Sequence, residues 1–155
     1  MDSSSMEHKQ HYGRFALMIG ISFILMYGFM YAMVNAFANV YPNYNQFYMA
    51  GLMTAPMIVL EIMLMSMMYP NKKANIAIIA GGVLFLVLCW FGIRQQIGVG
   101  DEQFLKSMIP HHAGAILMCE KASIRDTEIK KLCEGIIASQ SSEIDQMKGI
   151  LDRLK

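Results

Sequence analysis

A short stretch in the second half of the chain carries most of the side chains that could bind a metal ion. Met108-Ile109-Pro110-His111-His112 is followed six residues later by Met118-Cys119. Imidazole, thioether and thiolate groups are the ligands that copper and silver ions favour. Side chains three and four residues apart share one face of a helix, so Met108 can share a metal shell with His111 or His112. The stretch therefore predicts a soft-metal site.

The two adjacent histidines are not expected to bind one ion with ideal geometry. Neighbouring side chains on a helix point about 100° apart. One histidine can therefore bind the metal while the other forms a hydrogen bond, for example to Glu143, or binds across a dimer. From spacing alone, a histidine pair that satisfies hydrogen bonds in a core explains the motif equally well. Met118 lies nearly three turns beyond Met108, so it is assigned to a second site.

The motif is predicted to lie on the first of two outer helices. Asp101 is expected to cap this helix, which runs from about 102 to 123 and has Glu102 in its first turn. Pro110 removes one backbone hydrogen bond and frees the carbonyl of Lys106, which predicts a kink or an irregular preceding turn. A second, amphipathic helix is predicted from Asp126 or Thr127 to about Leu154.

An antiparallel register completes the predicted site. With the turn centred near Asp126, His112 lies opposite Gln140, and Met108 lies within a turn of Met147. Polar groups on the inner face of a helix need partners, and the first helix supplies them. The metal-site candidates are Met108, His111, His112, Met118, Gln140, Glu143 and Met147.

The same register places Cys119 opposite Cys133. A disulfide, a pair of metal ligands and two small apolar residues all remain consistent with this placement, because a disulfide needs both close Cα atoms and aligned Cβ vectors. Cys89 lies in an apolar run and is interpreted as inert packing.

Three long apolar runs precede the outer helices, at about 15–37, 47–69 and 74–93. Each has roughly 20 residues or more, enough to cross about 30 Å of hydrocarbon as a helix. Positive charges lie before the first run and between the second and third, whereas the loop 39–46 has none. Because positive residues favour the cytoplasmic side, the outer helices are predicted to be extracytoplasmic. We expect a cytoplasmic tail without regular structure (1–14), a three-span region (15–94), a linker (95–100) and a metal-binding helical hairpin (101–155).

Methionine and one acid are unusual within the predicted spans. Of 16 methionines, 11 lie between positions 18 and 68, and Glu61 lies deep inside the second span. A charged residue there is expected to face the helix bundle or a wet cavity. A methionine and carboxylate path for a soft cation is one interpretation, and a packing stripe with one hydrogen-bonded acid is the other.

The hairpin is too small to bury a full core by itself. Dimerisation into a four-helix bundle is the expected completion. The formal net charge is +1 and the hairpin is nearly neutral, which excludes the basic surface that nucleic acid requires. No second cofactor motif or substrate cleft is recognisable, so an enzyme is not predicted.

Two motifs together resemble a known family. They are Phe104-Leu105-x-x-Met108-Ile109-Pro110-His111-His112-x-x-Ala115-Ile116-x-Met118 and Ile136-Ile137-x-x-Gln140-x-x-Glu143-Ile144-x-x-Met147. They resemble the domain-of-unknown-function family that includes CopM-like periplasmic copper-binding proteins, and the run from Asn45 to Met53 resembles its membrane-anchored members. The resemblance implies a ferritin-like helical bundle, copper or silver binding and a role in metal tolerance. This chain has a single helical pair where some members have two.

The sequence as a whole therefore predicts an all-α protein of a bacterial inner membrane, with its C-terminal hairpin in the periplasm. Its expected function is to bind copper, with Cu(I) favoured over Cu(II), or silver, for buffering, chaperoning or tolerance. The expected partners are metal ions, membrane lipid and a second copy of the chain. The alternatives are a structural or partner-binding oligomer without essential metal, and a metal transporter that uses the methionines and Glu61.

Overall fold

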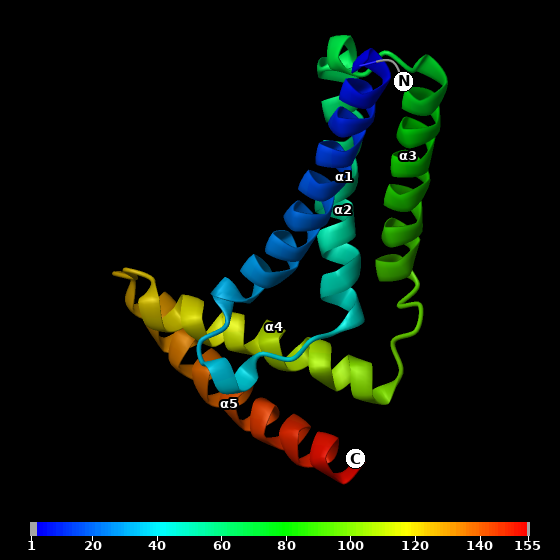
Figure 1. Cartoon of the computed structure of the whole chain (residues 1–155). Coiled ribbons are helices and arrows are strands. Elements are labelled where there is room, and N and C mark those ends of the chain that lie inside the picture. The colour runs from blue at the N-terminus through cyan, green and yellow to red at the C-terminus, as the bar shows by residue number, and fades with distance from the viewer. Residues whose placement is uncertain (1–2, 155) are drawn as a thin grey trace. The chain divides into compact units, whose positions relative to one another are not determined.

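The computed structural model describes residues 3–154, with side chains from Gln10 onward, and this part of the chain contains helices and no strand (Figure 1). The predicted all-α class is confirmed. The α-helices are α1 (Ser3–Phe29), α2 (Tyr44–Leu64), α3 (Lys72–Arg94), α4 (Asp101–Lys121) and α5 (Thr127–Leu154). Short 3-10 helices, η1 (Met30–Met33), η2 (Phe37–Asn39) and η3 (Ser66–Met68), lie between them.

The chain divides into two compact units, each built from two separate stretches. The first unit comprises residues 1–29 and 47–97, and the second comprises 30–46 and 98–155. The hairpin of α4 and α5 therefore shares its unit with the segment that connects α1 to α2. Sequence periodicity did not indicate that these two stretches pack together, because 30–46 was interpreted as the end of one span followed by a loop.

Three helices are long and apolar enough to cross a membrane: Gln10–Met33, Tyr44–Leu64 and Lys72–Arg94. They match the three predicted spans, with shifted ends. The first helix begins at Ser3, so the polar residues from there to Arg14 are helical, whereas an unstructured tail was expected. The second ends five residues earlier than expected and is followed by η3.

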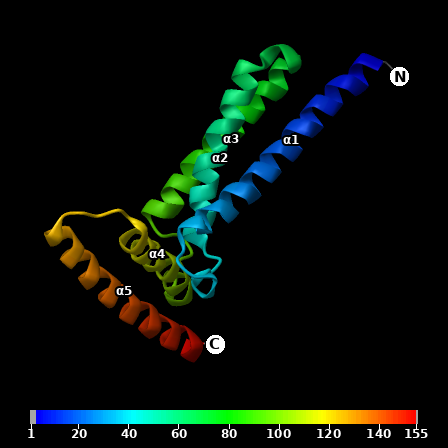
Figure 2. The ribbon, with the colours of Figure 1, turned by 90° about the vertical axis from the view of Figure 1, so that its left-hand side faces the viewer.

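Close packing of α2 against α3 depends on small residues, and the two helices run side by side in Figures 1 and 2. A methyl group on Gly82 would approach Ile58 to 3.1 Å, and one on Gly92 would approach Tyr48 to 2.8 Å. Such contacts leave no room for a larger side chain. Of the glycines predicted to allow close helix approach, Gly82 and Gly51 do so, whereas Gly28 and Gly81 face open space.

One end of the first unit is joined by a polar network that reaches all three spans. Tyr12 donates to Asn75 Oδ1 at 2.7 Å, and Asn75 Nδ2 donates to the Tyr69 carbonyl at 2.7 Å. The Tyr69 hydroxyl donates to Glu61 Oε1 at 3.3 Å. Glu61 is therefore a hydrogen-bonded acid at a helix junction, which agrees with the structural interpretation of this residue.

The hairpin in the second unit has the predicted boundaries within three residues. Asp126 Oδ1 accepts hydrogen bonds from the backbone N–H groups of Glu128 and Ile129, so it caps α5. Asp101 does not cap α4. It is the first helical residue, and Gly100 occupies the cap position without a side-chain bond. Figure 2 shows α4 and α5 lying alongside each other.

The core of the second unit lies between α4, α5 and the 30–46 segment. Val34 and Tyr41 of that segment pack against it, together with Ile137, Met147 and Ile150 of α5. The buried members of the core are Leu105, Ile109, Ala113, Ile116, Ile144 and Leu151.

Pro110 lies inside α4, and the helix continues through it from Asp101 to Lys121. Of the two expected outcomes, the irregular turn before the proline is therefore absent. Asn43, which is 3% exposed, donates from Nδ2 to the carbonyl of Lys106 at 3.3 Å. This is the carbonyl that a proline at 110 leaves without its helical partner. An asparagine 63 residues away thus satisfies the group that proline freed.

Candidate metal site on the helical hairpin

His112 is held on both sides of its ring. Its Nε2 lies 2.7 Å from Glu143 Oε2, and its Nδ1 lies 2.9 Å from the carbonyl oxygen of Met108. The side chain is buried, with 7% of the residue exposed. Both ring nitrogens of His112 face acceptor oxygens, so a metal ion can reach either nitrogen only if one of these contacts is released.

Glu143 is fixed by a second partner on its own helix. The hydroxyl of Ser139, one turn earlier, donates to Glu143 Oε1 at 2.7 Å. This hydrogen bond and then the one with His112 lower the pKa of the Glu143 carboxyl below its usual range, against a smaller opposing effect of burial. The carboxylate is therefore charged at neutral pH and holds His112 in place.

His111 has the opposite environment. It is exposed, and its ring lies 6.0 Å from that of His112, centroid to centroid, with the planes at 65°. Among the described residues its ring nitrogens have no hydrogen-bond partner. Adjacent positions on a helix diverge by about 100°, which sends one histidine into the hairpin and the other outward. Of the two, His111 is the one available as a ligand.

The outward histidine belongs to a row of side chains on α4 that neither α5 nor the 30–46 segment covers. The row recurs at alternating spacings of four and three, so it follows one side of the helix. Phe104 is 51% exposed and Met118 is 54% exposed. Met108 and Ala115 are partly exposed. The row comprises Phe104, Met108, His111, Ala115 and Met118.

A matching row lies on α5. Ile129 and Leu132, near the turn, are 48% and 61% exposed. Since Glu143 reaches His112 and Cys133 reaches Cys119, the two rows border one another along the hairpin. The row comprises Ile129, Leu132 and Ile136, and we refer to the two rows together as the uncovered face.

Gln140 and Met147 of α5 have different environments. Met147 packs against the core beside α4. Gln140 Oε1 is buried and has no hydrogen-bond partner among the described residues. His112 pairs with Glu143, the hydrogen-bond partner expected for one of the two histidines.

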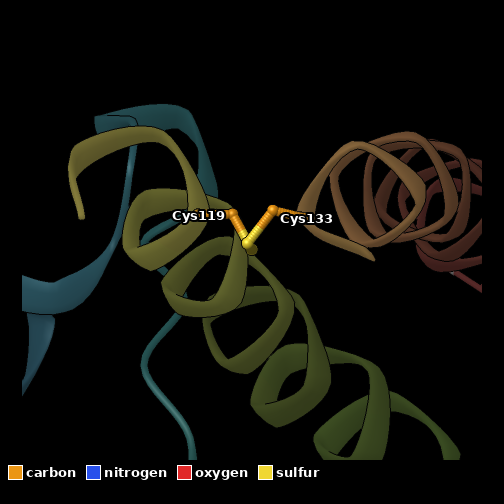
Figure 3. Close-up of a disulfide and its surroundings, with 2 residues drawn as sticks. All are labelled: Cys119 and Cys133. Carbon is orange, nitrogen blue, oxygen red and sulfur yellow. A yellow bond between two sulfur atoms is a disulfide. The ribbon is translucent and has the colours of Figure 1, made fainter. Parts of the chain in front are cut away.

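Cys119 and Cys133 form a disulfide between α4 and α5 (Figure 3). Their Cα atoms are 5.3 Å apart, inside the range that a disulfide requires. Of the three alternatives for this pair, the disulfide is the one that the structure contains. The predicted register of these two residues is therefore confirmed.

The candidate ligands do not converge on one point. Met108 and His111 are one turn apart on the uncovered face, whereas Met118 is a further seven residues away, about 10 Å along the helix. Within the described part of the chain, no three His, Cys, Asp or Glu side chains form a group able to hold a metal ion. On the uncovered face, Met108 and His111 are the thioether and the imidazole that lie one turn apart.

Two participants were missed by sequence reasoning. Asn43 supports α4 at Pro110, next to His111, and Ser139 holds Glu143. The carbonyl that Pro110 frees indicated that a hydrogen-bond donor must lie nearby. The sequence did not show which residue supplies that donor. The spacing of four between Ser139 and Glu143 was a usable signal for a contact on one helix.

The methionine stripe of the second span lies mainly on the outside of the first unit. Met49 and Met53 are 41% and 45% exposed, and Met65 is 40% exposed. Glu61 is bonded to Tyr69. These side chains do not line an enclosed path within the described part of the unit.

Comparison with known proteins places the hairpin in a family. Residues 92–153 match the family described as "Domain of unknown function (DUF305)". The chain is 38% identical over 113 residues to "Uncharacterized protein L153" of Acanthamoeba polyphaga mimivirus, covering 72% of each chain. That alignment is longer than the domain match, so the similarity also includes residues upstream of 92. No solved structure matches. The chain therefore belongs to the DUF305 family, and helices long and apolar enough to cross a membrane precede most of the matched region.

Proposed function

We propose that the hairpin binds Cu(I) or Ag(I) through Met108 and His111, and that the protein buffers or delivers these ions at a membrane. The observation that carries the proposal is the contrast between the two histidines. His112 is bonded at both ring nitrogens, whereas His111 is exposed one turn from a methionine. Thioether and imidazole together favour Cu(I), and imidazole alone also accepts Cu(II).

In this proposal a second copy of the chain completes the site. One chain offers only two ligands at Met108 and His111, and its uncovered face exposes large apolar side chains along two helices. Two such faces related by a two-fold axis would bury these side chains and join two hairpins into a four-helix bundle. Two thioethers and two imidazoles would then surround the ion.

The remaining predicted ligands have supporting roles in the proposed site. Glu143 and His112 hold α5 against α4 behind His111. Met118, farther along the same row, is exposed and would contact the partner hairpin. Met147 packs against the core beside α4 and Gln140 Oε1 is buried, so both would support the hairpin from within.

The proposed hairpin location is the extracytoplasmic side, which in a bacterial inner membrane is the periplasm. Lys72 and Lys73 lie at the opposite end of α3 from the hairpin connection, as the bias of positive residues toward the cytoplasm requires. The Cys119–Cys133 disulfide supports the same side, because disulfides persist in oxidising compartments.

The proposed role is binding and not catalysis. The ions would be held by soft ligands on a surface that a second hairpin covers, and this arrangement suits storage and transfer. The spans would keep the site at the membrane surface, with lipid as their solvent.

Metal titration of the purified full chain in detergent, with the disulfide intact, tests the proposal. Competition with a chromogenic Cu(I) chelator gives the affinity and the number of ions per chain. The variant Met108→Leu/His111→Ala keeps the apolar volume of the methionine and should bind Cu(I) at least about tenfold more weakly. The control His11→Ala/Met65→Leu changes the same residue types outside the hairpin and should bind as the wild type does.

The dimer is tested separately. Ala115 lies in the middle of the uncovered face, so Ala115→Arg places a charge where two hairpins would meet. We expect this variant to have the mass of one chain plus detergent and to lose Cu(I) affinity together with dimerisation. Unchanged Cu(I) affinity in Met108→Leu/His111→Ala would place the ion elsewhere and refute this site. A wild-type melting temperature that Cu(I) does not raise would instead leave an oligomeric structural protein as the function.

A further inference from the structure

The disulfide marks a second place where soft ligands are held together. Cys119 lies in the last turn of α4 and Cys133 in the second turn of α5, and both are partly exposed (Figure 3). The turn that joins these helices, residues 122–126, is also mostly exposed. A reductant in solution can therefore reach the sulfur atoms from the turn end of the hairpin.

The packing that holds the two cysteines together does not depend on their bond. The buried core residues lie between Leu105 and Ile116 on α4 and between Ile144 and Leu151 on α5, beyond the disulfide from the turn. On the other side, Asp126 caps α5 with two hydrogen bonds. With support on both sides, α4 and α5 remain paired after reduction, and the two thiols stay facing one another.

The spacing of the backbone suits a metal bridge as well as a sulfur bridge. A metal–thiolate bond is about 2.3 Å for zinc, so an ion between two sulfurs separates them by at most about 4.6 Å. Two side chains whose Cα atoms are 5.3 Å apart reach this separation by rotating about their Cα–Cβ bonds. Cu(I) and Ag(I) accept two thiolates in a nearly linear arrangement, and they prefer soft sulfur ligands.

We propose that Cys119 and Cys133 form a redox-masked binding site for one Cu(I) or Ag(I) ion, closed as the disulfide and opened by reduction. A dithiol reductant transfers two electrons and two protons to the disulfide, giving two cysteine thiols and its own cyclic disulfide. The ion then replaces the two thiol protons, which are released to water. The site shares no ligand with Met108 and His111, so it goes beyond the proposed function and is independent of it.

Cu(I) titration of the reduced and the oxidised full chain under anaerobic conditions tests this site. The reduced protein should bind one more ion per chain than the oxidised protein, with a new sulfur-to-copper charge-transfer absorption in the ultraviolet. Native mass measurement with Ag(I) should show the same additional ion. Equal stoichiometry in the two redox states would overturn the proposal and leave the disulfide as a purely structural bond.

Matched variants separate this site from the others. Cys119→Ser/Cys133→Ser should lose the reduction-dependent ion and keep the ion bound by the oxidised wild type. Met108→Leu/His111→Ala should show the opposite pattern. Cys89 is buried within the first unit, so Cys89→Ala should retain the reduction-dependent ion. Loss of that ion in the Cys89 variant, or its persistence in the double serine variant, would place it elsewhere and refute the assignment.

Discussion

His112 and Glu143 join the middle of α4 to the middle of α5, with Nε2 and Oε2 2.7 Å apart across 31 residues of sequence. The carbonyl of Met108 fixes the other ring nitrogen, and Ser139 fixes the other carboxylate oxygen. This chain of hydrogen bonds decides which histidine is buried. It leaves His111 on the surface, where the proposed metal ligand is needed.

Replacing the buried histidine should destabilise the hairpin, whereas replacing the exposed one should not. His112→Ala removes a buried ring that bonds both helices of the hairpin, and the loss of its packing should cost about 1–3 kcal/mol. His111→Ala should change the free energy of unfolding by less than about 0.5 kcal/mol, as exposed substitutions usually do. Urea unfolding of the metal-free protein in detergent measures both, and equal losses would contradict the assigned roles.

The stability of the hairpin should depend on acid through Glu143. Its pKa is lower in the folded protein than in the unfolded chain, first because of Ser139 and then because of His112. The stabilisation is therefore complete above the unfolded pKa and is lost as the pH falls through the folded one. Ser139→Ala should be less stable than the wild type at pH 7, and the difference should shrink in acid.

A pH series of urea unfolding, with Glu143→Gln as the control, checks this dependence. The amide variant has no carboxyl group at position 143 to titrate, so its stability should lack this acid-dependent loss. The difference in free energy of unfolding between the wild type and Ser139→Ala could instead stay constant down to strongly acidic pH. In that case the Ser139 hydrogen bond would not favour the charged form of the Glu143 carboxyl over the protonated form.

Loss of the disulfide should lower the free energy of unfolding, because the unfolded chain gains conformational entropy when the cross-link is absent. Cys119 and Cys133 are separated by 14 residues, and a loop of this size gives about 3 kcal/mol in the chain-entropy description. Cys119→Ser/Cys133→Ser should therefore melt at a lower temperature in the absence of metal. Adding a reductant should bring the wild type down to the variant and leave the variant unchanged.

Asn43 should stabilise α4 from outside the helix. Its Nδ2 donates to the Lys106 carbonyl, and its Oδ1 accepts from the backbone N–H of Gln46. Asn43→Ala leaves the Lys106 carbonyl without its donor in a partly buried place, which should cost about 1 kcal/mol. In the Pro110→Ala background the helix supplies its own N–H to that carbonyl, so the loss should be smaller. Equal effects of Asn43→Ala in both backgrounds would contradict the pairing with the proline-freed carbonyl.

Much of the local architecture followed from the sequence. Apolar runs of sufficient length indicated the three candidate spans, and the apolar period of α5 indicated the second helix and its start near Asp126. The antiparallel register opposed Cys119 to Cys133, which the disulfide confirms. These features depend on residues near one another in the chain or on one short turn, so periodicity and capping rules are enough to find them.

Tertiary structure decided the rest, for a physical reason. Periodicity defines the faces of a helix, but it does not say which distant segment covers each face. Only the fold shows that residues 30–46 pack against α4, that Asn43 meets the carbonyl freed by Pro110, and that His112 finds Glu143 while His111 stays exposed. The sequence alone determined that two histidines and a methionine occur together. The packing of the hairpin decided which histidine can act as a ligand.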